Sequence, residues 1–146
     1  MGNYQTITAI ADNLEIVLKG MGINFTRKAY DDMASIPTAI LPLGEITYNG
    51  ESFEHPSGQK SGYAEADYRL KVIIKESDAR DMQRVQMKWV HLIRDGLTVN
   101  ALNIGSLVSS KLVSNVLTEA ARPNNTQTDG IGAVEYDIKI RYREAA

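Results

Sequence analysis

Few residues in this sequence have the type and spacing that acid–base or metal chemistry requires. The chain has two histidines, His55 and His91, and no cysteine. Met87 and Asp95 lie four residues to either side of His91, so no second histidine stands at metal-ligand spacing, and His91 with Asp95 is typical of an exposed helix pair. No Gly-x-Ser-x-Gly elbow, Walker loop or His-Glu-x-x-His motif occurs. We therefore expect no catalytic residue and no bound metal.

Two short motifs need separate consideration, one for a cofactor and one for a lipid. Gly130-Ile131-Gly132 is a fragment of the dinucleotide fingerprint, but the third glycine is missing and no helix follows. Met1-Gly2-Asn3-Tyr4-Gln5-Thr6 fits the myristoylation pattern, yet no polybasic segment supplies the second signal that stable anchoring requires. We expect no cofactor and no membrane attachment.

Composition and charge narrow the class of protein further. The 146 residues correspond to one domain, 1–146, and 43% of them are hydrophobic and 23% charged, as in soluble globular proteins. Sixteen basic and eighteen acidic residues give a net charge of −2, which argues against a dedicated nucleic-acid binder. No apolar run reaches the roughly 18 residues of a membrane span.

Two segments have the apolar spacing of amphipathic helices. The first runs from Tyr4 to Lys19, where apolar residues recur three and four positions apart until Gly20. The second begins after Ser77 or Asp78, which have the side chains of helix caps, and ends at Gly96. Each helix should bury one apolar stripe.

Two other segments alternate apolar and polar residues, as half-buried strands do. They cover Ala64 to Ile74 and Val134 to Tyr142. Both carry acidic residues first and basic residues second on the polar side, so antiparallel pairing places opposite charges across from each other. We predict that these strands are antiparallel neighbours.

The remaining segments are assigned from weaker signals. Ile36 to Leu43 contains two prolines and predicts a short edge strand, with an extension over Glu45 to Tyr48. Leu107 to Ala121 has both helical and strand features, and we favour a strand from Lys111 to Thr118. Turn-forming residues predict long loops at Asn49–Gly62 and Arg122–Gly132.

These elements predict an α/β fold of the α+β kind. It is a two-layer sandwich in which two amphipathic helices cover one face of a mixed or antiparallel sheet. The other face of the sheet is polar and is either solvated or used against a neighbouring subunit.

Two apolar residues fall outside the helical stripes and are candidates for a subunit contact. Ile16 lies opposite the first stripe, and Met87 stands among polar residues of the second helix. Arg80 and Arg84 belong to a basic ridge on that helix, which is either a solvated face or a contact to phosphate or acidic side chains, and we favour the solvated face.

The order of elements resembles the tail-terminator, or tail-completion, proteins of long-tailed bacteriophages. The chain begins with an amphipathic helix, followed by the proline segment 36–42, a polar loop and an alternating strand. A capped helix with Trp89 comes next, and the chain closes with a strand pair that ends in Glu135-Tyr136-Asp137-Ile138-Lys139-Ile140-Arg141-Tyr142. The resemblance implies a non-enzymatic virion protein that forms a hexameric ring, caps the tail tube and joins it to the head–tail connector protein. It places the protein at the head–tail junction, and in the host cytoplasm before assembly, with DNA passing through the ring without specific binding.

Under this interpretation the two predicted loops contact the tube and connector proteins. The candidate contact residues there are Asn49, Glu51, Phe53, His55, Lys60, Arg122, Asn124, Asn125 and Asp129. The candidate subunit contacts are Ile16, Met87, Arg80 and Arg84. The alternatives are another head–tail joining or tube-related phage protein, and a small ligand-binding regulatory domain.

Overall fold

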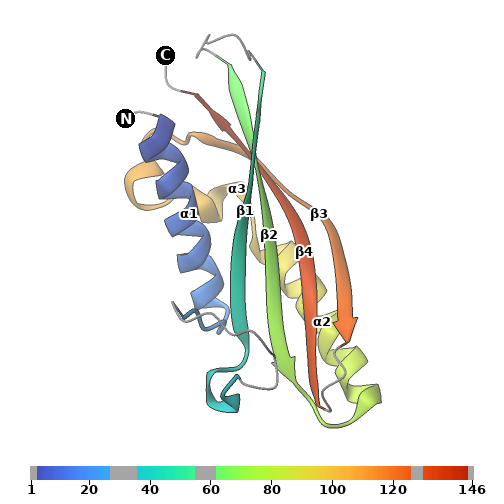
Figure 1. Cartoon of the computed structure of the whole chain (residues 1–146). Helices are drawn as coiled ribbons and strands as arrows, with labels where there is room; N and C mark the ends of the chain where they lie inside the picture. The colour runs from blue at the N-terminus through green and yellow to red at the C-terminus, as the bar shows by residue number, and fades with distance from the viewer. Residues whose placement is uncertain (1–2, 27–35, 55–61, 126–129, 145–146) are drawn as a thin grey trace.

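Four long strands form one antiparallel sheet (Figure 1). Along the chain, one long helix precedes the first two strands and a second long helix follows them. The computed structural model describes residues 3–26, 36–54, 62–125 and 130–144. In chain order the elements are α1 (Asn3–Gly20), the 3-10 turn η2 (Thr38–Ile40), β1 (Leu43–Phe53), β2 (Tyr63–Lys75), α2 (Ala79–Gly96), α3 (Val99–Leu102), the 3-10 turn η3 (Gly105–Leu107), β3 (Val113–Asn125) and β4 (Ile131–Arg143). The strand order is β1-β2-β4-β3, so β1 and β3 are the edges.

The two clear strands of the sequence, β2 and β4, are antiparallel neighbours at the centre of the sheet, as predicted. Their register places an acid opposite a base in four successive outward pairs: Glu65 with Arg141, Asp67 with Lys139, Arg69 with Asp137, and Lys71 with Glu135. Opposite charges facing each other across strands favour this register, by about 0.2–1 kcal/mol per pair.

Both long helices cover the same face of the sheet, which confirms the predicted α+β sandwich. Ile10 and Leu14 of α1 and Ile93 of α2 are fully buried in one core with the inward residues of β2 and β4. In Figure 1, α1 lies beside the β1 half of the sheet and α2 lies against the half formed by β4 and β3. Within the described residues, no helix combines the length and apolar character needed to cross a bilayer.

The start of α2 is fixed by the predicted cap. The Asp78 side chain accepts hydrogen bonds from the backbone amides of Arg80 and Asp81, at 2.8 and 3.0 Å. A cap of this kind contributes about 1 kcal/mol, because it satisfies amides that have no partner inside the helix.

The Gly130-Ile131-Gly132 segment has a structural role at the turn into β4. Gly130 has a φ of 78°, in the region that favours glycine. A Cβ at Gly132 would lie 2.8 Å from Sδ of Met82, so this glycine lets α2 pack closely on β4. The segment opens a strand rather than a helix, unlike the dinucleotide fingerprint.

The predicted edge strand from Ile36 to Leu43 was wrong. Thr38–Ile40 forms a 3-10 turn, and the strand begins only at Leu43 and runs through Tyr48 to Phe53. Pro37 and Pro42 lack the amide donors that a strand ladder requires. Ile36 instead packs with Leu43, Ile73 and Ala133, and covers one end of the face that we predicted to be wholly polar and free.

The two predicted long loops were also too long. Residues 49–53 belong to β1, Tyr63 begins β2, residues 122–125 end β3, and β4 starts at Ile131. Pairing with the two strong central strands outweighs the turn preference of these polar residues, and Pro123 is tolerated because β3 is an edge strand. The predicted strand at Lys111–Thr118 is confirmed, although its bounds differ: β3 begins at Val113 and continues to Asn125.

Candidate functional site

A β-bulge in β1 determines which side chains face the helices. Tyr48 pairs with Tyr68, but the next pair in register is Glu51 with Ala66, so two residues of β1, Asn49 and Gly50, lie opposite one residue of β2 and β1 has one extra residue. Gly50 within the bulge has a φ of 98°. Because alternation restarts after a bulge, Glu51 and Phe53 point to the same inner face as Tyr48.

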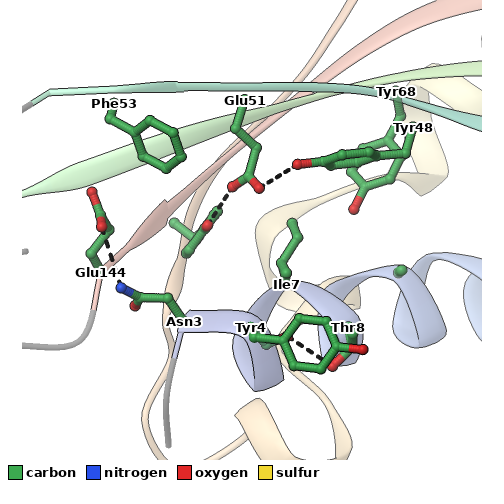
Figure 2. A pocket seen from close by; sticks show the side chains of 11 residues that line it. Asn3, Tyr4, Ile7, Thr8, Tyr48, Glu51, Phe53, Tyr68 and Glu144 are labelled. Atoms are coloured by element: carbon green, nitrogen blue, oxygen red, sulfur yellow. Dashed lines mark hydrogen bonds between the residues drawn. The ribbon is translucent and has the colours of Figure 1, made fainter. Parts of the chain in front are cut away.

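These inner residues form a pocket of about 460 Å³ against the N-terminal half of α1 (Figure 2). It lies at the end of the sheet where the β1–β2 hairpin and the last residues of β4 meet the helix. The lining residues are Asn3, Tyr4, Ile7, Thr8, Ala11, Tyr48, Glu51, Phe53, Tyr68, Tyr142 and Glu144. Aromatic and aliphatic groups make most of the wall, with two carboxylates at one side.

The carboxylate of Glu51 is held by two phenols. Tyr48 donates to one of its oxygens and Tyr142 to the other, as the dashed lines in Figure 2 show. The hydrogen bond to Glu51, with some burial, raises the pKa of Tyr48 to about 12. Burial first, and then the bond to Glu51, raises the pKa of Tyr142 as well. Both phenols are therefore protonated donors at neutral pH.

Two further oxygen atoms at the pocket are buried without a partner among the described residues. The side chain of Tyr68 is 2% exposed, and its hydroxyl, which points toward α1 in Figure 2, makes no hydrogen bond. Burial raises the pKa of this phenol. Oε2 of Glu144 accepts from Nδ2 of Asn3 at 3.3 Å, whereas Oε1 has no partner. A buried polar atom without a partner costs about 1–3 kcal/mol.

The rim of the pocket carries exposed aromatic side chains. Tyr4 is 78% exposed, Tyr48 52% and Phe53 50%. Large apolar side chains gathered at the edge of a pocket mark a surface that binds another molecule. Aromatic residues are also enriched where proteins contact each other.

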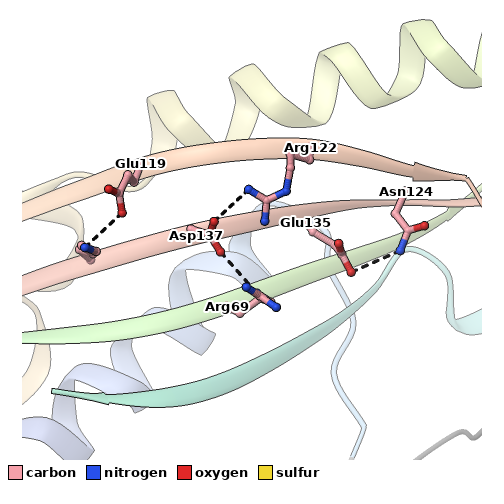
Figure 3. A network of polar contacts seen from close by, with 7 residues as sticks. Arg69, Glu119, Arg122, Asn124, Glu135 and Asp137 are labelled. Carbon is pink, nitrogen blue, oxygen red and sulfur yellow. Dashed lines mark hydrogen bonds and ion pairs between the residues drawn. The ribbon is translucent and has the colours of Figure 1, made fainter.

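The outer face of the sheet carries a second polar feature, a network of ion pairs (Figure 3). Asp137 contacts Nη1 of Arg122 at 3.0 Å and Nε of Arg69 at 3.4 Å, and Lys139 contacts Glu119 at 3.3 Å. The two arginines, Arg122 foremost, lower the pKa of Asp137, and the bond to Glu119 raises the pKa of Lys139. The network joins β2, β4 and β3 and leaves the face close to charge balance.

The residues predicted to form partner loops divide into three groups. Glu51 and Phe53 line the pocket, while Asn49 lies in the bulge of β1. Arg122 belongs to the ion-pair network, Nδ2 of Asn124 donates to Glu135, and the backbone of Asn125 pairs with Gly132. His55, Lys60 and Asp129 lie outside the described residues. A role for these residues in contacting partners stays a prediction.

The residues predicted for a subunit contact are all on the surface. Ile16 is 56% exposed on α1 and Met87 is 63% exposed on α2. Arg80 and Arg84 are exposed one turn apart on the same side of α2 as Met87. No described residue forms an ion pair with either arginine.

Sequence reasoning missed the residues that complete the pocket. Tyr48, Tyr68, Tyr142 and Glu144 were assigned to strands or not assigned to any site. One signal was present, because Gly50 in the middle of a polar strand is typical of a bulge that turns the following side chains to the other face.

The chemistry available at the pocket is recognition. The described residues contain no group of three or more side chains suited to holding a metal ion. Glu51 already accepts two hydrogen bonds, and its phenol partners are protonated donors, so the cluster has fixed polarity. Two carboxylates and several aromatic faces, with no lysine or arginine among the described lining residues, favour a cationic group.

Comparison with known proteins gives a fold similarity. The sequence matches no family model and no curated protein sequence. Among solved structures, the chain is similar to a chain from the virion of a native gene transfer agent (GTA) particle, with a TM-score of 0.51 and 12% sequence identity. The match covers 94% of this chain and 93% of the other. At this identity the two chains share a fold.

Proposed function

We propose that this chain is a structural component of a phage-like virion, and that it acts there as a tail terminator. In this role copies of the chain form a ring, with six as the expected number, on the last ring of the tail tube. The ring ends polymerisation of the tube and presents a surface to the head–tail connector protein.

The observation that carries the proposal is the fold match to a chain of a GTA virion over nearly the full length of both chains. The same order of elements underlies the resemblance to tail terminators. The match covers 94% of this chain, so nearly all of the sequence takes part in the shared fold.

The described surface has the features that a ring requires. A cyclic ring uses heterologous contacts, in which one patch of a subunit meets a different patch of the next. The rimmed pocket lies at one end of the sheet, and α2, which carries the exposed Met87, begins at the other end (Figure 1). These are two unlike surfaces on separate parts of the molecule.

The charge distribution on the outer face of the sheet supports passage of DNA along that face rather than tight binding to it. Non-specific binding to DNA depends on cations free to displace counterions. On the outer sheet face, Arg69, Arg122 and Lys139 are each paired with a carboxylate, and the whole chain is mildly acidic.

The direct test of the proposal is the assembly state of the purified protein. Light scattering over a wide concentration range, with and without a divalent cation, should show growth toward a closed oligomer, and electron microscopy should show rings. Because such a ring can require a finished tube, the same measurements belong on protein mixed with tail tubes. Failure to form rings alone and to bind tube ends would overturn the proposal.

A labelled copy of the chain in assembled particles separates the terminator from the related alternatives. A terminator should give one ring of label between head and tail, and particles lacking the gene should have unjoined tails of variable length. Label along the tube would instead identify a tube-related protein.

The pocket favours a second candidate function, a small ligand-binding domain. It is concave, largely apolar and bordered by a few polar groups, as ligand sites are. Binding of a small molecule to the folded chain stabilises it by RT ln(1 + [L]/Kd), so the melting temperature rises with ligand concentration. A melting shift with one compound of a metabolite panel, absent in Thr8→Trp, would support this candidate.

A further inference from the structure

One face of α2 carries basic residues that have no acidic partner among the described residues. Arg80, Arg84 and Lys88 are spaced four residues apart and are exposed, and Met87 and His91 lie between them on the same face. We call this set the α2 ridge. The acids of the helix, Asp81 and Asp95, flank the α2 ridge, and none of the ion pairs of the described residues involves either of them.

Such an arrangement weakens the isolated helix. Like charges four residues apart destabilise a helix by about 0.2–0.5 kcal/mol per pair, and the α2 ridge contains two such pairs. The exposed Met87 among these cations adds apolar surface that water does not favour. Arginine next to an adaptable apolar side chain is typical of contact surfaces rather than of solvated ones.

The pocket has the complementary chemistry. Glu51 and Glu144 supply negative charge, and the part of the wall that the structure describes contains no lysine or arginine. Tyr4, Tyr48 and Phe53 present exposed aromatic rings, on which a guanidinium or ammonium group stacks favourably. The hydroxyl of Tyr68 and Oε1 of Glu144 are closed off from solvent and lack partners among the residues that the structure describes, so a group that enters the pocket can supply them with a hydrogen bond.

We propose that this pocket receives a basic side chain from the α2 ridge of a second copy of the chain. The contact buries Met87 against the aromatic rim and pairs the inserted cation with the carboxylates of Glu51 and Glu144. Long basic side chains suit this role, because their apolar stems pack along the rim while the charged head reaches the acids.

The placement of the two surfaces excludes contact within one chain. The pocket is formed by the N-terminal half of α1 and the hairpin end of the sheet, whereas α2 begins at the far end of the sheet (Figure 1). Since the donor and the receptor are different patches, the contact is heterologous and repeats from copy to copy. The inference rests on the proposed ring and names the contact that would build it.

The test uses two variants that each disable one side of the contact. The ridge variant is Arg80→Gln, Arg84→Gln and Lys88→Gln, which keeps residues that favour helix. The pocket variant is Thr8→Trp, which fills the mouth of the pocket from an exposed position on α1. Circular dichroism should show that both retain the native fold.

Association is measured by light scattering and by amide NMR spectra as the protein is diluted from millimolar to micromolar concentration. The natural chain should associate, with shifts at pocket and ridge residues together, and each variant alone should stay monomeric. An equimolar mixture should give a species with the mass of two chains and nothing larger, because only one intact pocket and one intact ridge then meet.

Matched variants control for charge and shape. Lys19→Gln, Lys75→Gln and Lys111→Gln remove the same charge elsewhere on the surface and should associate as the natural chain does. Glu51→Gln keeps the shape of the pocket and should raise the dissociation constant about tenfold, which is about 1.4 kcal/mol.

Three results would overturn the proposal: a natural chain that does not associate at millimolar concentration, variants that associate unchanged, or a mixture that stays monomeric. The proposed function is tested separately in particles. If both variants enter particles and join heads to tails, the ring uses other surfaces. That result would overturn the proposed contact at the pocket and leave the proposed terminator function unaffected. If the natural chain is absent from particles, the terminator fails regardless of its association in solution.

Discussion

Three tyrosines on the inner face of the sheet differ in what their hydroxyl groups contact, although all three rings sit against the core. Tyr142 donates to Glu51, whereas the hydroxyls of Tyr68 and Tyr136 have no partner among the described residues. A buried hydroxyl without a partner has lost its bonds to water and gained nothing in return. The same chemical group therefore stabilises at one position and destabilises at another.

Replacement by phenylalanine tests this difference at matched positions. Tyr142→Phe should lower the free energy of unfolding by about 1–3 kcal/mol, because it removes a hydrogen bond to a charged carboxylate. Tyr68→Phe should leave it unchanged or raise it, since only an unsatisfied oxygen is removed. Urea unfolding of the two variants gives the comparison, and an equal loss in both would show that Tyr68 has a partner after all.

The raised pKa values of these tyrosines predict a loss of stability in alkali. The pKa of Tyr48 is about 12 in the folded chain against 10.0 for the free group, and the pKa values of Tyr68, Tyr136 and Tyr142 are raised further. Above pH 10 the unfolded chain releases protons that the folded chain keeps, so the free energy of unfolding must fall as pH rises. The stabilisation is complete below pH 10 and is lost as pH rises through the folded-state pKa values.

Phenolate absorbance followed together with circular dichroism checks this expectation. The buried tyrosines should ionise only as the chain unfolds, and in Tyr48→Phe the free energy of unfolding should fall less steeply above pH 10. Ionisation of all tyrosines near pH 10 with the fold intact would show that their environment does not disfavour the phenolate.

At the scale of elements, the bulge in β1 decides whether Glu51 and Phe53 reach the pocket. Gly50 adopts a φ of 98° there, and among the described residues no atom beyond its chain neighbours lies within 4 Å of the place a Cβ would occupy. Backbone strain is thus the only penalty for a side chain, and Gly50→Ala should lower the free energy of unfolding by about 1–2 kcal/mol. Gly20→Ala is the control, because that position at the end of α1 also has open space but no positive φ.

Thermal or urea unfolding measures both glycine variants. The Gly20 variant should be neutral or slightly more stable, since alanine favours helix by up to about 1 kcal/mol. Equal behaviour of the two variants would mean that the bulge tolerates an ordinary residue, and that its conformation does not fix the direction of Glu51.

The elements that the sequence predicted correctly are those whose pattern is long and uninterrupted. The stripe of α1, the cap and stripe of α2, and the alternation of β2 and β4 each extend over nine or more residues, and all four elements were found. The charge order along β2 and β4 also predicted their pairing, because acid and base face each other only in the antiparallel arrangement.

The elements that were missed depend on partners far away in the sequence. Polar segments with Asn, Gly and Pro favour turns locally, yet residues 49–53 and 122–125 are strands because β2 and β4 offer them a ladder. Most of the pocket was missed for the same reason. Tyr48, Tyr142 and Glu144 meet only through tertiary packing, whereas the exposure of Ile16 and Met87 followed directly from helical periodicity.

At the scale of the whole molecule, one core connects the two ends that the proposed ring uses. Asn13 of α1 is buried and donates to the backbone carbonyls of Leu102 and Ile104, at 2.9 and 3.0 Å. The N-terminal helix is therefore tied to the segment that follows α2.

This arrangement predicts that the chain unfolds as a single domain, in one transition. Leu14 of α1 and Ile93 of α2 belong to the same cluster of buried residues, so neither helix can detach without exposing core residues of the other.

Trp89, partly buried on α2, reports on one end of the sheet through its fluorescence, and the tyrosines at the pocket report on the other through near-ultraviolet circular dichroism. The two signals should give the same urea midpoint and slope. Asn13→Ala should shift both equally to lower urea, because it leaves one buried and one partly buried carbonyl without this donor. If the tryptophan signal changed at lower urea than the tyrosine signal, the two ends would be separate folding units, and the pocket and the α2 ridge would not be held in one rigid subunit.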